Sequence, residues 1–371
     1  MSKTILILGG NGFIGAECVE YLLDNNDDYN LILVNRNNWD DWDTRERIKS
    51  RIKLNIKCDR KTDSLKDALK DYLDNEDFKF EAVIDFSAYK SRVIKNFFQD
   101  IPSEKVKLYI LISTDSVYEV SEINRERENL ILYETDSVRP ENKSEREKLK
   151  ELDSYGHHKL KCEEELLKQK SLSYVILRLP DVIGKRDSTN RFWFYQMYLE
   201  FLEYKNPGQK HEIEISKFYL DKKTSYVYVG DVAKVIKKVL DSNVKNEIFN
   251  LGYDETLTIG DVLSLIGSFI KPGLADRIKC VPVENCAKYI YEPFPSVTKG
   301  PVSTEKVKQI LGFEPSNLNE TFKESVEFYK DAYEKFESDR RIIEKELKNE
   351  WIKSKNEQEK FKNFINSYIK K

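Results

Sequence analysis

The sequence predicts an α/β fold, with a doubly wound parallel sheet, a smaller C-terminal α+β region and a charged helical tail. Three observations predict it. Short β-rich runs alternate with helical patterns over the first 180 residues, Gly and Pro become more frequent after Pro180, and about half of residues 337–371 are charged. Strands that alternate with helices form βαβ units, and these build a parallel sheet that is covered on both faces.

Each strand of this sheet is predicted from a short apolar run. The runs occupy residues 4–8, 31–34, 52–56, 82–86, 108–112 and 174–178. Helices are predicted over 14–23 and 64–73, with Ser64 as the N-cap of the second. Residues 119–153 are highly charged and are predicted to form a loop with short helical pieces. A further helical pattern runs from Phe322 to Lys371.

Composition excludes several classes of protein. Of the 371 residues, 62 Lys and Arg oppose 65 Asp and Glu, so there is no global positive field, which argues against a nucleic-acid partner. The 12% aromatic content argues against a disordered chain. Five scattered Cys and three His form no common zinc pattern, so we expect no metal site and a reduced, cytoplasmic location. No stretch reaches 18 apolar residues, so we expect no membrane partner.

The first functional signal is a glycine-rich loop between the first strand and the first helix. Such a loop lets backbone N–H groups approach a pyrophosphate at the helix N-terminus. A plain glycine turn is the alternative, but the position within a βαβ pattern favours a dinucleotide site. The residues predicted to bind the cofactor here are Gly9, Asn11, Gly12, Phe13, Ile14 and Gly15.

The end of the second strand indicates which dinucleotide is preferred. An acidic residue here would bind the ribose 2′-OH of NAD, whereas an Arg suits the 2′-phosphate of NADP. The chain has Asn35 followed by Arg36. This favours NADP and leaves NAD open, with a solvated loop cation as the other interpretation of Arg36.

A Tyr and a Lys spaced four residues apart give the second functional signal. Tyr155 and Lys159 begin a helical stretch, so they lie one turn apart on one face. Tyr219 and Lys223 repeat the spacing by chance beside a β-like run. The fifth strand ends near Thr114, and a hydroxyl at that edge of a parallel sheet lies where such sheets bind ligands.

With these motifs, the sequence resembles the extended short-chain dehydrogenase/reductase superfamily, the NAD-dependent epimerase/dehydratase family, over about residues 3–330. Further segments that resemble the family are Arg178–Gly184, Tyr228–Ala233 and Phe249–Gly252. The resemblance implies a Rossmann domain over 1–180, to which 224–253 return, a substrate-binding region over the rest of 181–330, and an extension over 331–371. It also implies that Asp59 contacts adenine and that Ser87 and Ala88 line the nicotinamide side.

The resemblance implies hydride transfer on a sugar-like or nucleotide-sugar substrate. Tyr155 would be the general acid/base, Lys159 would favour its phenolate and bind the nicotinamide ribose, and Thr114 would hold the substrate oxygen. Ser116 stands where the dehydratases have a carboxylate. Thr224 stands where some epimerases have an Arg for the diphosphate, with Lys222 and Lys223 beside it.

The alternatives are a regulatory or RNA-binding module that keeps the fold but not catalysis, and a C-terminal segment that serves as an interaction element. His157 and His158 are interpreted as surface or supporting residues. An aromatic run that contains Phe192, Trp193 and Tyr195 could form a substrate wall, although such runs are more often core. By resemblance we expect a homodimer that binds a small-molecule substrate.

Overall fold

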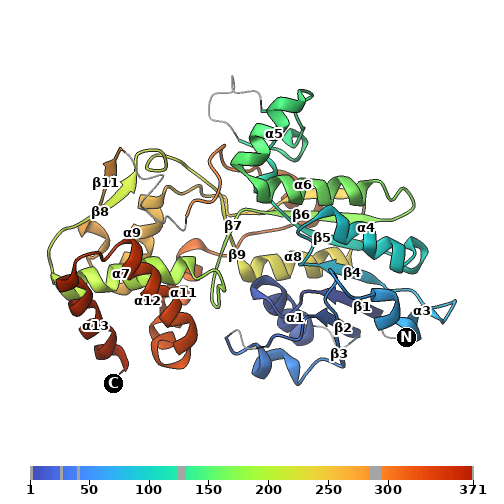
Figure 1. The fold of residues 1–371 in the computed structure, drawn as a ribbon, viewed down its shortest axis with the longest axis horizontal. Helices are drawn as coiled ribbons and strands as arrows, with labels where there is room; N and C mark the ends of the chain where they lie inside the picture. Colours follow the sequence, from blue (N-terminus) through green and yellow to red (C-terminus); the bar gives the residue numbers. More distant parts are fainter. Residues whose placement is uncertain (1–2, 26–27, 40–41, 124–130, 285–293, 370–371) are drawn as a thin grey trace. The chain divides into compact units, whose positions relative to one another are not determined.

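The computed structural model describes residues 3–25, 28–39, 42–123, 131–284 and 294–369 (Figure 1). The chain folds into two compact units, each assembled from three chain segments. Unit 1 comprises Met1–Pro180, Val229–Asp254 and Pro301–Pro315, whereas unit 2 comprises Asp181–Tyr228, Glu255–Gly300 and Ser316–Lys371. The sequence assigned 301–315 to the substrate region and 331–371 to a separate extension, but the structure groups them with unit 1 and unit 2.

Unit 1 contains a seven-stranded parallel sheet, which confirms the predicted fold class. The strand order is β10-β6-β5-β4-β1-β2-β3. Six of the strands lie where the apolar runs predicted them, and the seventh, β10, was not predicted. The strands are β1 (Lys3–Leu8), β2 (Tyr29–Asn35), β3 (Leu54–Lys57), β4 (Ala82–Asp85), β5 (Tyr109–Thr114), β6 (Tyr174–Leu179) and β10 (Glu247–Asn250).

The strand order predicts where on the sheet a ligand binds. From β1 the chain proceeds through β2 and β3 toward one edge of the sheet, and from β4 through β5 and β6 toward the other. The direction reverses between β1 and β4, whose carboxyl ends therefore lie at the switch point where open α/β sheets bind ligands. The segment after β1 carries the predicted glycine loop, and the segment after β4 carries Ser87 and Ala88, which were predicted to line the cofactor.

Helices cover both faces of the sheet. On one face α1 (Phe13–Asn25) packs against α8 (Val229–Asp241), and α4 (Ser91–Asp100) packs against α6 (Ser154–Leu167) on the other (Figure 1). The core beneath α4 and α6 joins alternate strand residues to both helices. Its members include Leu6, Leu8, Val83, Leu111, Ile94, Phe97, Cys162 and Leu166. Burial on both faces explains why the strands are continuous apolar runs.

The remaining elements of unit 1 are short. They are α2 (Leu65–Ala68), α3 (Lys70–Leu73), α5 (Lys143–Leu152) and α10 (Glu305–Leu311), with short turns at Arg45–Lys49, Ser103–Lys105, Asp115–Val117 and Glu134–Asp136. The helix predicted over 64–73 is broken at Leu69. Its predicted N-cap is confirmed, since the Ser64 hydroxyl accepts a hydrogen bond from Asp67 N at 3.1 Å. The structure also adds α4, which the sequence pattern did not predict.

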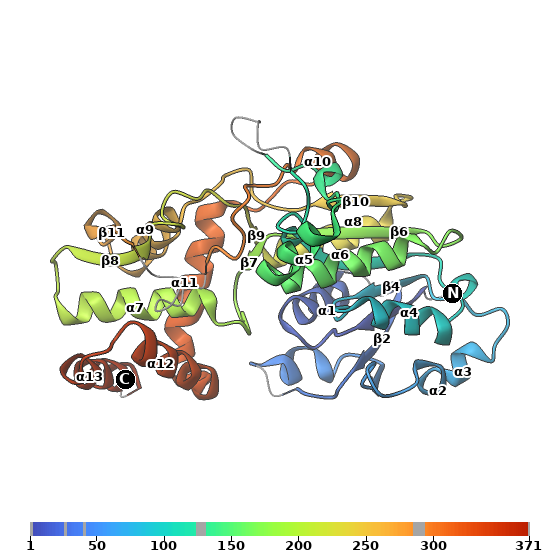
Figure 2. The same ribbon diagram turned by 45° about the horizontal axis from the view of Figure 1, so that its top comes forward.

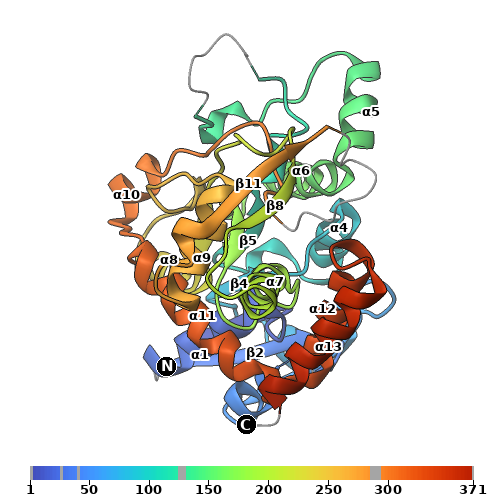
Figure 3. The same cartoon turned by 90° about the vertical axis from the view of Figure 1, so that its left-hand side faces the viewer.

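Unit 2 is the predicted smaller α+β region. Its helices are α7 (Arg191–Lys205), α9 (Ile259–Ile270), α11 (Leu318–Lys335), α12 (Glu337–Glu350) and α13 (Lys355–Ile369). Strand β8 (His211–Ser216) pairs in parallel with β11 (Ile278–Val283), as Figure 3 shows, and β7 (Asp181–Ile183) pairs in parallel with β9 (Tyr226–Tyr228). A short turn at Ala275–Arg277 precedes β11.

The charged tail is part of the core of unit 2. Helices α12 and α13 both contact α7 (Figure 2). The rings of Phe361 and Phe201 meet edge to face at 5.1 Å between centroids, and Trp351 meets Tyr198 at 4.5 Å. Phe192, Trp193 and Tyr195 have no exposed surface, so the aromatic run of α7 is core and forms no substrate wall. In the described part of the chain, no helix is long and apolar enough to cross a membrane.

Candidate active site

The glycine loop that follows β1 fits a dinucleotide pyrophosphate. Gly9 has φ of +83°, and its N–H donates to Val34 O at 3.0 Å. A Cβ on Gly15 would overlap the carbonyl oxygen of Gly9, so only a glycine lets α1 begin this close to the loop. A Cβ on Gly12 would meet nothing nearer than 3.8 Å. The loop therefore presents backbone and open space at the start of α1, which is the arrangement that anionic phosphates require.

The other residues of the loop are less constrained. Asn11 donates its side-chain amide to the backbone oxygen of Asn38, and Phe13 and Ile14 form the first turn of α1. All three side chains are partly exposed.

The end of β2 presents a cation and no carboxylate. Asn35 is buried, and its amide is already engaged, donating to Asn55 Oδ1 at 2.7 Å and accepting from Asn37 N at 2.7 Å. Arg36 is exposed and makes no ion pair with any described residue. The end of β2 therefore offers one exposed cation and no carboxylate.

The predicted adenine and nicotinamide contacts lie in unit 1 after β3 and β4. Asp59 is partly exposed and accepts a hydrogen bond from Lys61 N at 3.0 Å. Ser87 lies against the glycine loop, because a Cβ built on Gly9 would be 3.0 Å from the Ser87 Cβ. Ala88 is fully buried.

Thr114 and Tyr155 are brought together at the end of β5. The Thr114 hydroxyl caps the turn Asp115–Val117 by accepting from Ser116 N at 3.2 Å, donates to Asp115 Oδ1 at 3.3 Å, and lies beside the Tyr155 side chain. Gly156 makes this approach possible, because a Cβ there would overlap the Ser116 carbonyl oxygen. Asp153 caps α6 by accepting from Gly156 N at 2.7 Å.

Lys159 lies one turn further along α6 and is buried beneath the site. Its ammonium donates to the backbone oxygens of Ala88 at 3.0 Å and Ile112 at 2.5 Å. The ring of Tyr89 lies over it, with 5.5 Å between Nζ and the ring centroid, and stands 6.3 Å from the ring of Tyr155. The structure thus brings Thr114, Tyr155 and Lys159 together and adds Tyr89, which the sequence analysis missed.

The electrostatics of the pair depend mainly on desolvation. Desolvation of the Tyr155 hydroxyl raises its pKa although 46% of the whole residue is exposed, the nearby Tyr89, Asp115 and Asp153 raise it further, and the Thr114 hydroxyl lowers it. Burial also lowers the pKa of Lys159. In this structure the Lys159 ammonium is directed to two carbonyl oxygens, and its predicted role toward the Tyr155 phenolate stays a prediction.

A buried ion pair supports this end of the sheet. Arg178 of β6 and Glu163 of α6 pair at 2.7 Å, with 1% and 2% of their side chains exposed. Arg178 also donates to Tyr118 OH at 3.0 Å, and that hydroxyl donates to Asn250 Oδ1 at 2.7 Å. Ser113, next to Thr114, donates to Glu163. Two of the resembling segments thus contribute Arg178 and Asn250, and Tyr118 joins them in one network that ties β5, β6 and β10 together.

His157 is more buried than predicted. It is 5% exposed and lies beside Arg139, at 3.2 Å between Nδ1 and Nη1. Burial and the nearby positive charge of Arg139 lower its pKa to about 4, so it is neutral near pH 7. Its backbone oxygen also accepts a hydrogen bond from Arg139 Nη2 at 3.2 Å.

The comparison with family models now identifies the family. Residues 5–252 match the model of the NAD dependent epimerase/dehydratase family. The chain belongs to this family. No curated protein matches the chain.

Solved structures of the family share the fold at low sequence identity. The UDP-glucose 4-epimerase of Thermotoga maritima, solved with UDP-glucose, is 21% identical with a TM-score of 0.62, over 89% of this chain and 99% of that one. The UDP-glucuronic acid 4-epimerase of Bacillus cereus, in complex with NAD, is 19% identical with a TM-score of 0.62, over 89% and 99%. The dTDP-glucose 4,6-dehydratase of Bacillus anthracis, also with NAD, is 18% identical with a TM-score of 0.61, over 89% and 97%.

Proposed function

We propose that this family member is an NAD(P)-dependent oxidoreductase or epimerase that acts on a hydroxyl or carbonyl group of a sugar-like substrate. The observation that carries the proposal is the close approach of Tyr155 to Thr114, with Lys159 one helical turn away and the glycine loop in the same unit. These groups supply a proton donor, a group that holds the substrate oxygen, a buried cation and a phosphate cradle.

The dinucleotide, when bound, supplies the hydride acceptor and donor. The backbone of Gly9–Gly15 would hold its pyrophosphate. The neutral Tyr155 hydroxyl donates a proton to a substrate carbonyl oxygen, and Thr114 holds that oxygen. In the reverse direction Tyr155 must lose its proton to act as a base, and a positive charge close to its hydroxyl favours that loss. Lys159 supplies this charge only when its ammonium turns from the Ala88 and Ile112 carbonyls toward the site.

The substrate class is proposed as sugar-like, with nucleotide sugars as one subclass. The structural neighbours named above are nucleotide-sugar enzymes. Ser116 supplies no carboxylate for eliminating water, which weighs against a 4,6-dehydratase. Thr224 is fully buried, and its N–H is bonded to Leu257 O at 3.1 Å, so this position offers no charge to a diphosphate. Lys222 and Lys223 are the nearest cations in sequence.

NADP is the proposed preferred cofactor, supported by Arg36 and by the engaged amide of Asn35. Titration with NADPH and NADH, followed by reduced-nicotinamide fluorescence, tests this. We expect tighter binding of NADPH than of NADH. Arg36→Ser should lower the ratio of the two affinities about tenfold, because one charge-assisted contact to the 2′-phosphate is lost. Arg146→Ser, on α5, is the matched control. Equal or tighter NADH binding by the wild-type protein would contradict the NADP proposal and leave the fold assignment intact.

The catalytic assignment has its own test. Tyr155→Phe is expected to keep dinucleotide binding and to lower turnover by about 10² to 10⁴-fold, the usual contribution of a general acid. Tyr133→Phe, at an exposed tyrosine outside the site, is the control. Full activity in Tyr155→Phe on an identified substrate would rule out the role given to Tyr155.

One observation favours a second candidate, a regulatory or RNA-binding module that binds the dinucleotide without turnover. The ammonium of Lys159 is bonded to two carbonyl oxygens and covered by Tyr89, so it does not serve Tyr155 in this conformation. The two candidates differ in two measurable ways. An enzyme turns over a panel of sugar alcohols and ketones and shifts no RNA at micromolar protein and physiological salt, whereas a module shows the converse.

The homodimer and the cytoplasmic location remain predictions from the sequence. Static light scattering of the full chain tests the first, and a monomer mass at micromolar concentration would refute it. Fractionation of cells that produce the protein tests the second.

A further inference from the structure

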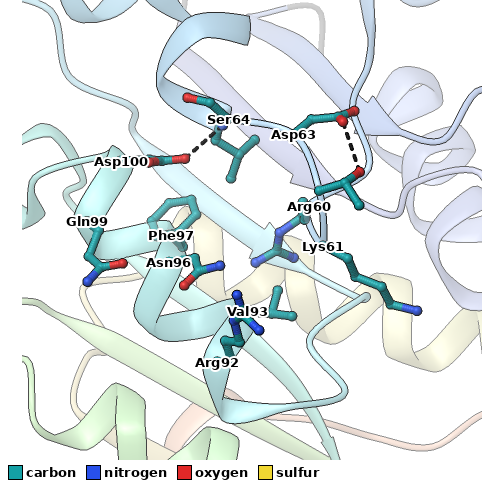
Figure 4. A pocket seen from close by; sticks show the side chains of 12 residues that line it. Arg60, Lys61, Asp63, Ser64, Arg92, Val93, Asn96, Phe97, Gln99 and Asp100 are labelled. Carbon is teal, nitrogen blue, oxygen red and sulfur yellow. Dashed lines mark hydrogen bonds between the residues drawn. The ribbon is translucent and has the colours of Figure 1, made fainter.

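A polar pocket of about 320 Å³ lies beside the predicted cofactor residues Asp59 and Ser87, and the proposed mechanism uses none of the residues that line it. It is bounded by residues 60–65, which follow β3, and by α4 (Figure 4). Its walls combine cations, amides and a few apolar side chains. The lining includes Arg60, Lys61, Arg92, Asn96, Val93 and Phe97.

Arg60 is the buried polar group of this pocket. Only 8% of its side chain is exposed. One terminal nitrogen, Nη1, donates to Asp85 Oδ1 at 2.7 Å and to Ser87 Oγ at 2.9 Å. Asp85 is fully buried and also accepts from Tyr109 OH at 2.6 Å. The guanidinium is therefore held at one corner by β4, and Figure 4 shows it directed into the space between Asn96 and Val93.

The other edge of the guanidinium has no partner. Nε and Nη2 are buried, and neither makes a hydrogen bond with any described residue. Their N–H bonds point in parallel from one edge of the planar group, which is the geometry that binds two oxygens of a phosphate or carboxylate. A buried cationic donor pair without acceptors is costly, so this edge favours a ligand that supplies two oxygens.

The charges around the pocket agree with an anion. Lys61 and Arg92 are exposed on its rim and make no ion pair within the described parts of the chain. Two carboxylates also line the pocket, but backbone N–H groups already bind them. Asp63 accepts from Asp59 N at 2.7 Å, and Asp100 accepts from Leu65 N at 2.8 Å. Both carboxylates thus already have main-chain hydrogen-bond donors.

We propose that this pocket is a second anion site, distinct from the glycine loop, that takes the phosphate group of a small phosphomonoester. Arg60 binds two phosphate oxygens through Nε and Nη2, and Arg92 adds charge at the rim. The pocket volume of about 320 Å³ is larger than a few water molecules of about 30 Å³ each, so there is room for more than the phosphate group. The amide and apolar side chains of the pocket would contact the rest of the phosphomonoester. The site does not depend on which dinucleotide the chain prefers.

Isothermal titration of the full-length protein with inorganic phosphate and with ribose 5-phosphate tests the site. We expect saturable binding of one molecule, tighter for the ester. Arg60→Lys keeps a cation beside Asp85 but loses the two parallel N–H donors of Nε and Nη2. We expect this change to weaken phosphate binding by about 10 to 100-fold. Arg92→Gln is expected to weaken it about 2 to 5-fold.

Lys95→Gln is the matched control, since Lys95 is exposed on α4 and does not line the pocket. Arg92→Gln alone carries the test if Arg60→Lys does not fold, which thermal unfolding reports. The proposal is overturned by an absence of saturable binding at about 10 mM ligand, or by binding that neither variant weakens. It is also overturned if saturating NADPH or NADH abolishes the binding, because the pocket would then belong to the dinucleotide site.

Discussion

The buried pair of Arg178 and Glu163 gives the sharpest prediction for stability. The change Glu163→Gln keeps the size of the side chain and removes its charge. Arg178 would then keep its bonds to Tyr118 and to the backbone oxygen of Glu134 but would be a buried cation without a counter-charge. Removal of one member of a buried pair costs about 3 to 5 kcal/mol, because the remaining charge stays desolvated.

The neighbouring residue Glu164 provides a matched control. It also pairs with an arginine, Arg139, but 41% of its side chain is exposed. An exposed pair of this kind contributes about 0 to 1 kcal/mol. The two substitutions, Glu163→Gln and Glu164→Gln, are therefore the same chemical change on adjacent residues of α6, and they differ in burial.

Thermal unfolding followed by circular dichroism measures both variants. For a folded body of about 150 to 250 residues, 1 kcal/mol corresponds to roughly 2 to 4 °C, so Glu163→Gln should lower the midpoint by roughly 6 to 20 °C. Glu164→Gln should lower it by at most about 4 °C. Equal shifts for the two variants would refute the argument that the buried network holds β5, β6 and β10 together.

Three further outcomes are expected. Gly15→Ala should destabilise unit 1, since its Cβ would overlap the Gly9 oxygen, whereas Gly12→Ala should keep the unfolding midpoint and weaken dinucleotide binding, as seen by fluorescence titration. Burial raises the pKa of Glu200 from 4.5 to about 7, so the native state binds more protons than the unfolded state between these values and loses stability as pH rises through that window. Glu200→Gln should flatten this dependence in urea unfolding at pH 5 and pH 8. Phe361→Ala should cost about 3 to 5 kcal/mol in urea unfolding, as a cavity in a fully buried site, while the adjacent Lys362→Ala should stay within about 0.5 kcal/mol.

The sheet and the proximity of Thr114, Tyr155 and Lys159 could be predicted because each depends on short stretches of sequence. Strands buried on both faces are continuous apolar runs, and β1 and β5 show this plainly. The glycine loop is likewise local, since the approach of α1 requires glycine at residue 15. The spacing of Tyr155 and Lys159 follows from one helical turn.

The remainder depends on contacts between distant residues. Arg60 and Asp85 are 25 residues apart and belong to no motif, although a carboxylate that ends the apolar run of β4 was a signal that a buried partner exists. The environment of Lys159 depends on the backbone oxygens of Ala88 and Ile112, and a residue pattern does not show where carbonyls point. The tail was predicted as a charged extension, and its packing on α7 depends on a few aromatic rings, which its charge content does not reveal.

The interleaving of the two units bears on how the chain is made. Unit 1 needs residues as late as Pro301–Pro315, and its edge strand β10 comes only after the first segment of unit 2 has been synthesised. During synthesis, one edge of β6 therefore stays unpaired until β10 has left the ribosome. An exposed strand edge is the part of a sheet most prone to pair with another chain. A nascent chain that stalls between Pro180 and Glu247 should aggregate, whereas one released after Pro315 has every segment needed to complete the first unit.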